Sequence, residues 1–208
     1  MNTIWVSPDT SDVIWTAAMA DHLGSFRYHL PWNAMIDDMI EQNGLMVHGG
    51  LAMWRDRSLL FLAPPGGGKS TTLSTAPKSW QVLSDDAVLV WPEQGNGWKV
   101  SPLPSWTNLT SEQPQTQPSV SFSCKLTGLI RIKKAEFVHL DRLDPLQAAP
   151  SLYRACSDYP MLVMANVDCR EHSFKLAATL ARDLPCWQLE LPLHGDIWGL
   201  LDNLLEAL

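Results

Sequence analysis

The chain has 208 residues, of which 46% are apolar and 18% charged, and 15 Lys and Arg against 22 Asp and Glu give a formal net charge of −7. The apolar share is ordinary for a globular domain and excludes a disordered chain. The acidic balance argues against a general nucleic-acid binder, which needs a clustered basic face. The length predicts one domain over 1–208, with residues 1–45 as an N-terminal extension.

Several features of the sequence bear on the compartment. No apolar run approaches the ~18–20 residues that span a bilayer. The first residues have neither a basic start nor a continuous apolar stretch, so they do not resemble a secretory signal. The four cysteines are Cys124, Cys156, Cys169 and Cys186, and no two of them form a Cys-x-x-Cys pair. We expect them to be free thiols rather than zinc ligands. We therefore expect a cytoplasmic protein without membrane or nucleic-acid partners.

The first 45 residues mix short apolar pieces with polar breaks. Ile4–Val6 predicts a short strand. Ile14–Leu23 predicts a short helix with Asp12 as a candidate cap. Asn33–Gln42 is helical by composition, and Asn43-Gly44 is typical of its end.

Strand patterns dominate residues 45–100. Leu45–Trp54 is apolar apart from His48-Gly49-Gly50, and Ser58–Ala63 is a continuous apolar run, typical of a strand buried on both faces. Asn96-Gly97 is a hairpin signal. We expect strands over 45–54, 58–63, 81–83, 87–91 and 98–100, and a helix over 69–76 that Pro77 ends.

The rest of the chain becomes helical towards its end. Residues 102–121 are rich in Pro, Ser, Thr and Gln and predict a long loop. Leu129–Leu140 is strand-like, as one strand or two. Asp144-Pro145 is typical of a helix start. We expect helices over 145–156, 171–183 and 196–208, the last capped by Asp196, and a strand over 187–193. The predicted class is α/β, with a strand-rich centre and a helical C-terminal part.

The strongest chemical signal lies between the strand at 58–63 and the helix at 69–76. The segment Ala63-Pro-Pro-Gly-Gly-Gly-Lys69-Ser70 differs in one position, Ala63, from the phosphate-binding pattern G-x-x-x-x-G-K-[ST]. Glycines let a loop turn tightly and point consecutive N–H groups at an anion, and a helix N-terminus adds partial positive charge. Lys69 can reach the β- and γ-phosphates, and the Ser70 hydroxyl can bind Mg²⁺. The residues expected to hold the phosphates are Pro65, Gly66, Gly67, Gly68, Lys69, Ser70 and Thr71. The alternative is a glycine-rich turn with an incidental lysine.

A pair of carboxylates follows the next strand. Asp85 and Asp86 lie 16 and 17 positions after Lys69, so a short helix and a returning strand would bring them towards the loop, at the strand ends where open α/β sheets bind ligands. One carboxylate can bind Mg²⁺ and the other can accept the proton of an attacking hydroxyl. Successive strand residues face opposite ways, so the two need not share a role. The alternative is a polar strand end or a helix cap.

The stretch from Val47 to Val90 resembles the catalytic domain of HPr kinase/phosphorylase and of its shorter HprK-related relatives. The matching features are His48-Gly49, an apolar strand, the glycine loop with Lys69-Ser70, a short helix and Leu83-Ser84-Asp85-Asp86. Phosphoenolpyruvate carboxykinases share the loop and the paired aspartates. Short HprK-like proteins of this size also resemble members of peptide-maturation cassettes, including the SynChlorMet type.

The resemblance implies a P-loop nucleotide-binding domain of the HPr kinase/phosphoenolpyruvate carboxykinase type. It implies that His48 is an active-site histidine, which on its own would more commonly be a core residue. It further implies that Lys69 and Ser70 serve the phosphates and Mg²⁺, that Asp85 is the general base, and that Asp86 is a metal-site carboxylate.

Three residue classes outside these motifs also have candidate roles: tryptophans, a lysine pair and arginines. Four tryptophans flank the paired aspartates in the sequence: Trp80, Trp91, Trp98 and Trp106. They could stack on a nucleobase or a peptide, but packing in the core is the commoner role of tryptophan. Lys133-Lys134 is more typical of a solvated strand edge than of an anion site. Arg131, Arg154 and Arg170 are candidates for stabilising γ-phosphate charge, and spacing does not choose among them.

Three functions remain open. The first is an ATP- and Mg²⁺-dependent kinase whose acceptor is a peptide, a small protein or a small molecule, in a chain that could form homo-oligomers. The second is a nucleotide-binding accessory protein of a peptide-modification assembly. The second HPr kinase signature favours it slightly, because it survives only as Thr127–Ile130 without its arginine. The third is a mechanical P-loop ATPase.

Overall fold

The computed structural model describes residues 3–6, 13–16, 39, 43–93, 95, 97–103, 122–157, 167–192 and 195–208. The chain separates into two units, residues 1–41 and residues 42–208. In the first unit, β1 (Thr3–Val6) pairs antiparallel with β2 (Val13–Thr16).

The helix expected from Ile14 is wrong for residues 14–16, which belong to β2. The sequence Val-Ile-Trp-Thr consists of β-branched and aromatic residues, which favour an extended backbone, and pairing with β1 satisfies its backbone groups. Of the helix expected over Asn33–Gln42, only Met39 is described, and it is helical.

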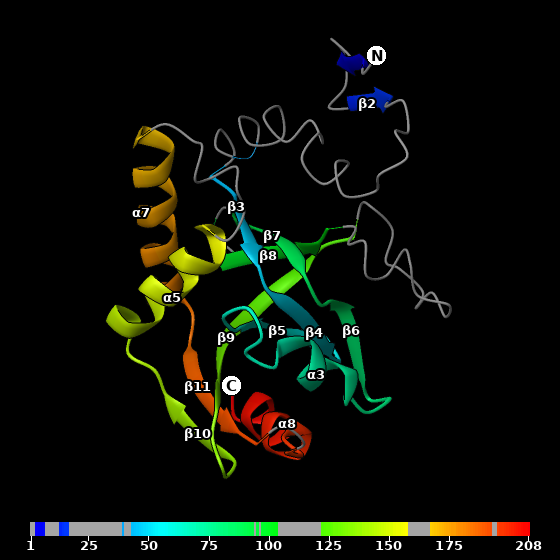
Figure 1. Ribbon diagram of the computed structural model, residues 1–208, viewed down its shortest axis with the longest axis vertical. Helices are drawn as coiled ribbons and strands as arrows, with labels where there is room; N and C mark the ends of the chain where they lie inside the picture. Colours follow the sequence, from blue (N-terminus) through cyan, green and yellow to red (C-terminus); the bar gives the residue numbers. More distant parts are fainter. Residues whose placement is uncertain are drawn as a thin grey trace. The chain divides into compact units, whose positions relative to one another are not determined.

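The second unit is built on a nine-stranded mixed sheet (Figure 1). Its main path runs β3-β7-β8-β9-β5-β4-β6, β11 pairs with β9, and β10 pairs with β11. The strands are β3 (Leu45–His48), β4 (Gly50–Trp54), β5 (Arg57–Leu62), β6 (Trp80–Ser84), β7 (Ala87–Glu93), β8 (Gly97–Pro102), β9 (Cys124–Lys134), β10 (His139–Arg142) and β11 (Cys186–Leu191).

Three of these strands, β5, β9 and β11, are mutually parallel. The first half of β9 pairs with β8 and its second half with β11 on the same edge, while β5 pairs along the other edge. The carboxyl ends of the three parallel strands therefore meet at one end of the sheet. This is the end at which β5 leads into the glycine loop.

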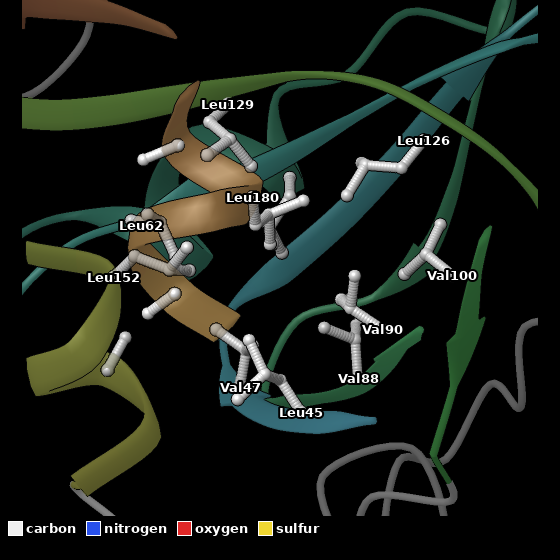
Figure 2. Close-up of a cluster of buried hydrophobic side chains, with 14 of the residues drawn as sticks. Leu45, Val47, Leu62, Val88, Val90, Val100, Leu126, Leu129, Leu152 and Leu180 are labelled. Atoms are coloured by element: carbon white, nitrogen blue, oxygen red, sulfur yellow. The ribbon is translucent and has the colours of Figure 1, made fainter. Parts of the chain in front are cut away.

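Different helices cover the two faces of the sheet. On β5, Leu60 and Leu62 join the core cluster of α5 (Pro145–Ser157) and α7 (Val167–Asp183), which Figure 2 shows in part. The alternate residues Leu59 and Phe61 join the cluster of α3 (Lys69–Ser74) and α8 (Trp198–Glu206). This alternation is what a strand buried on both faces requires.

Most of the elements expected from the sequence are present, with shifted ends. The apolar stretch Leu45–Trp54 divides into β3 and β4 at Gly49, and the stretch Leu129–Leu140 contributes to β9 and β10. Asp144 Oδ1 accepts a hydrogen bond from Leu146 N at 2.8 Å, so it caps α5 as expected. The final helix begins at Trp198, whose N–H bonds to Asp196 Oδ1 at 3.2 Å.

Lys133 and Lys134 end β9 opposite Glu190 and Leu191 of β11. Both are exposed, as expected, and the ladder from β5 stops at Arg131, so the two lysines are paired with β11 on one side of the strand. Among the tryptophans, Trp80 is buried and stacks on Trp54, which confirms a packing role. Trp106 and the loop expected over 102–121 lie outside the described residues, apart from Pro102, which ends β8, and Leu103.

None of the helices in the described part of the chain combines the length and the hydropathy that crossing a bilayer requires. Within the same part, the four cysteines form no disulfide.

Candidate functional site

The glycine loop between β5 and α3 has the geometry that its three glycines permit. Gly66 and Gly68 have φ values of 71° and 99°, a region that side chains with a Cβ rarely adopt. At Gly67 the limit is space, because a Cβ there would lie 2.7 Å from the carbonyl oxygen of Pro64. The N–H of Gly67 also donates to that oxygen, at 2.8 Å, which closes the turn. The loop is therefore a tight bend whose backbone any larger residue would disturb.

Lys69 is the first residue of α3 and is only 7% exposed. Its side chain passes Gly50, at the start of β4, where a Cβ would lie 3.4 Å from Lys69 Cγ and 2.2 Å from Leu73 Cδ1. The glycine at position 50 thus leaves the space that α3 and its lysine occupy. A buried ammonium is costly unless negative charge or polar groups surround it.

His48 and Asp86 lie together at one corner of the same unit. His48 Nε2 is 3.5 Å from Asp86 Oδ1. The backbone fixes this proximity, since His48 faces Ala87 in the β3–β7 ladder and the N–H of Gly49 donates to the carbonyl oxygen of Asp86 at 3.1 Å. The fold therefore brings together two residues that are 38 positions apart in the sequence.

Asp85 occupies the turn between β6 and β7, beside Asp86. Its Oδ1 is buried and accepts no hydrogen bond from the described residues. A buried carboxylate oxygen without a donor is uncommon in folded proteins and needs an explanation. The preceding residue is well held, because the Ser84 hydroxyl donates to Ala87 O at 2.9 Å. The turn is thus ordered by Ser84, which leaves the Asp85 carboxylate available for a ligand.

The remaining loop residues are more open. Pro65, Gly66, Ser70 and Thr71 are exposed, so a ligand can reach them. No group of three or more His, Cys, Asp or Glu side chains among the described residues is arranged to hold a metal ion. Mg²⁺ usually needs only one or two carboxylates, because waters and substrate phosphates complete its octahedron. Ser70 and Asp86, the residues expected at the metal, carry a hydroxyl and a carboxylate, which are donor types that Mg²⁺ takes.

Beside the loop lies a cavity of about 540 Å³, a size typical of small-molecule sites. The loop residues 63–67 form one wall, the end of β9 a second, and α5 a third. Basic side chains from β9 and α5 line it, and the residues that bound it include no acid; they are Leu62, Ala63, Pro64, Pro65, Gly66, Gly67, Arg131, Ile132, Lys133, Lys134, Ser151, Arg154, Ala155 and Gln188.

The three candidate arginines differ in their position relative to the cavity. Arg131 and Arg154 line it together with the loop, whereas Arg170 of α7 does not. Sequence reasoning missed Ser151 and Gln188, which belong to elements that reach the loop only through the crossover from β9 to β11. The one available signal was the alternation of Trp187–Leu191, which places Gln188 and Glu190 on one face of a strand.

The sequence was also compared with known proteins. The family model described as SynChlorMet cassette protein ScmC matches residues 28–206, a range that includes the loop, His48, both aspartates and the cavity. No curated protein matches the chain.

Proposed function

Since the chain belongs to the SynChlorMet cassette protein ScmC family, we propose that it acts within such a cassette as an ATP- and Mg²⁺-dependent kinase. The observation that carries the proposal is the loop of Gly66, Gly67 and Gly68, which ends directly at the buried Lys69. Two positive φ values and one position without room for a Cβ are what a backbone cradle for phosphate needs.

The proposal includes the fold type, a P-loop domain related to HPr kinase. The strand–loop–helix order of β5, the loop and α3 supports it. In this domain the loop residues 65–71 would surround the β- and γ-phosphates, with the N–H groups of Gly66 and of residues 68–71 as donors, since Pro65 has no N–H and that of Gly67 closes the turn on Pro64 O. The Lys69 ammonium would provide a point charge for the phosphates. The buried position of Lys69 strengthens that attraction, because the local dielectric is lower than in water.

The carboxylates at the β6–β7 turn would complete the reaction centre. When bound, Mg²⁺ would neutralise phosphate charge, with Ser70 and Asp86 as its protein contacts. Asp85 would accept the proton of the acceptor hydroxyl while that oxygen bonds to the γ-phosphorus and the bond to the β–γ bridging oxygen breaks, releasing ADP. The unsatisfied Asp85 Oδ1 supports this role. His48, 3.5 Å from Asp86, would orient that carboxylate.

The acceptor would be a hydroxyl of a peptide, a small protein or a small molecule. In this proposal the acceptor is another component of the same cassette, and the chain acts as a homo-oligomer. One observation favours a second function. Thr127–Ile130, which corresponds to the second HPr kinase signature, is part of strand β9 and contains no arginine. A nucleotide-binding accessory protein would need only the loop.

Calorimetry and phosphate transfer test the proposal together. Wild type should bind ATP more tightly with Mg²⁺ than without, and Lys69→Ala should weaken binding at least about tenfold, because a charge-assisted contact contributes about 1.5–3 kcal/mol. Asp85→Asn should bind ATP within about threefold of wild type and transfer no labelled γ-phosphate to the cassette's peptides and proteins.

Asp56→Asn is the matched control, because it makes the same substitution at an exposed hairpin position. It should change neither binding nor transfer. Absence of ATP binding by wild type would sink the whole proposal. Transfer by Asp85→Asn at the wild-type rate would remove Asp85 as the base, and ATP binding without transfer to any cassette component would favour the accessory function.

A further inference from the structure

Positive charge gathers in the cavity beside the loop although the chain carries a net charge of −7. Four cationic side chains line it: Arg131, Lys133, Lys134 and Arg154. Lys133 is paired with Glu190 at 2.7 Å, but no ion pair among the described residues involves the other three. Cations that converge without counter-ions repel one another, so this arrangement favours an anionic ligand.

Arg131 is held in place by neutral partners. Its Nη1 donates to Ser151 Oγ at 3.2 Å and to Gln147 O at 3.4 Å, and its Nη2 donates to Gln188 Oε1. A guanidinium has five N–H donors, so three of them fix its plane and two remain for a ligand. Because none of the partners is charged, the full positive charge of Arg131 stays available.

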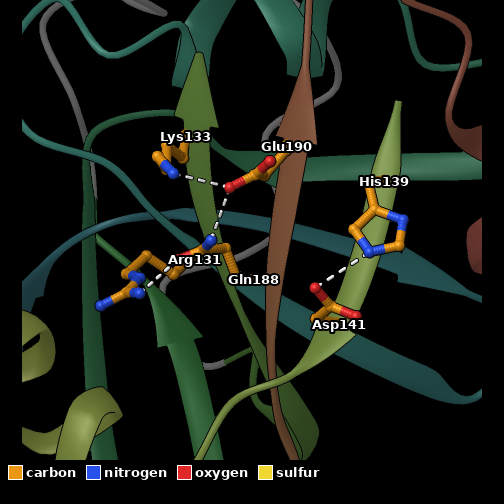
Figure 3. Close-up of polar contacts among 6 residues, drawn as sticks. All are labelled: Arg131, Lys133, His139, Asp141, Gln188 and Glu190. Atoms are coloured by element: carbon orange, nitrogen blue, oxygen red, sulfur yellow. Dashed lines mark hydrogen bonds and ion pairs between the residues drawn. The ribbon is translucent and has the colours of Figure 1, made fainter. Parts of the chain in front are cut away.

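Gln188 takes its position from the parallel ladder of β9 and β11. Gln188 faces Arg131 in that ladder, and Glu190 faces Lys133. Figure 3 shows the resulting chain, in which Gln188 Nε2 donates to Glu190 Oε1 at 2.8 Å and Lys133 Nζ donates to the same oxygen at 2.7 Å. The Gln188 amide is thereby oriented, with its oxygen towards Arg131. Gln188 is a positioning residue for the arginine.

The walls of the cavity also carry apolar surface. Leu62, Pro64, Ile132 and Ala155 line it beside the cations. A volume of about 540 Å³ exceeds what an inorganic ion needs. The ligand that fits is an organic anion, with one or two acidic groups on a partly apolar skeleton.

We infer that this cavity, beside the proposed phosphate site, binds an organic anion, a carboxylate or a phosphate ester, with Arg131 and Arg154 as its main contacts. It adjoins the proposed phosphate site, because Pro65, Gly66 and Gly67 line it, but none of Lys69, Asp85 and His48 does. Its chemistry suits an acidic group on the acceptor or an acidic effector. The inference does not depend on nucleotide binding, so it stands or falls apart from the proposed kinase activity.

The test uses Lys69→Ala, in which the proposed phosphate site is weakened, and two probes: citrate as the carboxylate and phenyl phosphate as the phosphate ester. Calorimetry should show saturable binding of at least one probe, and the tighter probe assigns the acidic group. Adding Arg131→Gln or Arg154→Gln should weaken that binding about tenfold each, since each removes a charge-assisted contact. Gln188→Leu should weaken it less, by about threefold.

Lys78→Gln is the matched control, because it removes one positive charge at an exposed position outside the cavity. It should leave the affinity unchanged. Arg154 is exposed and has no hydrogen bond or ion pair with another of the described residues, so Arg154→Gln remains informative even if Arg131→Gln unfolds. Equal weakening by Lys78→Gln or unsaturable binding would overturn the inference. Competition between the probe and ATP·Mg²⁺ in wild type would also overturn it, because the anion would then occupy the phosphate site itself.

Discussion

The glycine loop shows how single residues set the site. Gly68 needs a positive φ and Gly67 needs the absence of a Cβ, so the two glycines answer different demands within two positions. Gly50, outside the loop, is required for a third reason: a Cβ at this position would collide with Leu73 and crowd Lys69 of α3. Substitutions at these positions should therefore fail for different reasons.

Gly68→Ala tests the conformational demand alone, because no atom lies within 4 Å of a Cβ at that position. At φ 99° an alanine should lower the free energy of unfolding by roughly 1–2 kcal/mol. ATP affinity should fall with it, because the loop backbone would move to relieve the strain. Urea denaturation and calorimetry measure the two effects.

Gly199→Ala supplies the opposite result from the same substitution. Gly199 lies in α8, has no atom within 4 Å of a Cβ, and is not among the glycines with positive φ. Alanine should stabilise the helix by about 0.5–1 kcal/mol. If both variants shifted stability in the same direction, the argument from φ at Gly68 would be wrong.

At the scale of elements, β9 and β11 combine packing with charge. Their ladder puts Trp187 and Leu189 in the α8 cluster and leaves Gln188 and Glu190 for the other face. The hydrogen bond from Lys133, together with its charge, lowers the pKa of Glu190 below its ordinary value of 4.5. The ion pair therefore stabilises the fold only while Glu190 is ionised.

The lowered pKa predicts a pH dependence with a definite sign. A carboxyl group whose pKa is lower in the folded state contributes stability above its unfolded pKa and loses it on acidification. The stability difference between wild type and Glu190→Gln should therefore be constant at neutral pH and shrink as the pH falls below about 4.5. Urea denaturation between pH 3 and 7 measures it. In a Lys133→Met background the shrinkage should be smaller, and an unchanged curve there would remove Lys133 as the cause.

The elements themselves were largely predictable because their signals are local. The run Ser58–Ala63, the turn at Asn96-Gly97 and the Asp144-Pro145 start depend on near neighbours, and β5, the β7–β8 hairpin and α5 follow them. Val13–Thr16 failed because its pairing with β1, rather than its helical spacing, decides its structure. The break of β3 from β4 at Gly49 likewise depends on a distant partner, Asp86.

On the scale of the whole molecule, stability depends on the two clusters that cover the sheet. Leu152 of α5 is fully buried in one of them, whereas Leu146, on the same helix, is 85% exposed. Leu152→Ala should cost about 2–5 kcal/mol, because it removes buried methyl groups and leaves a cavity. Leu146→Ala should stay within about 0.5 kcal/mol of wild type. Chemical denaturation compares the two, and equal effects would contradict the assigned burial of α5.

The candidate site was predictable only where it is continuous in sequence. Residues 65–71 and the pair Asp85-Asp86 carry recognisable spacing. The residues of the cavity have no such spacing, because Arg131, Ser151 and Gln188 come from three elements. Only the crossover through α5 and α7 brings these elements together. The pairing of Lys133 and Lys134 with β11 was not predictable for the same reason, since that parallel strand lies far along the chain.

That late partner matters while the protein is being made. The ribosome finishes β9 at Lys134 and must add 51 more residues before Cys186 begins β11. At about 5–20 residues per second, the second half of β9 keeps one edge unpaired for roughly 3–10 seconds. A nascent chain with an open, apolar strand edge is a substrate for chaperones and a starting point for aggregation. Slowing translation between the codons for Lys134 and Cys186 should therefore lower the yield of folded protein more than slowing it after β11.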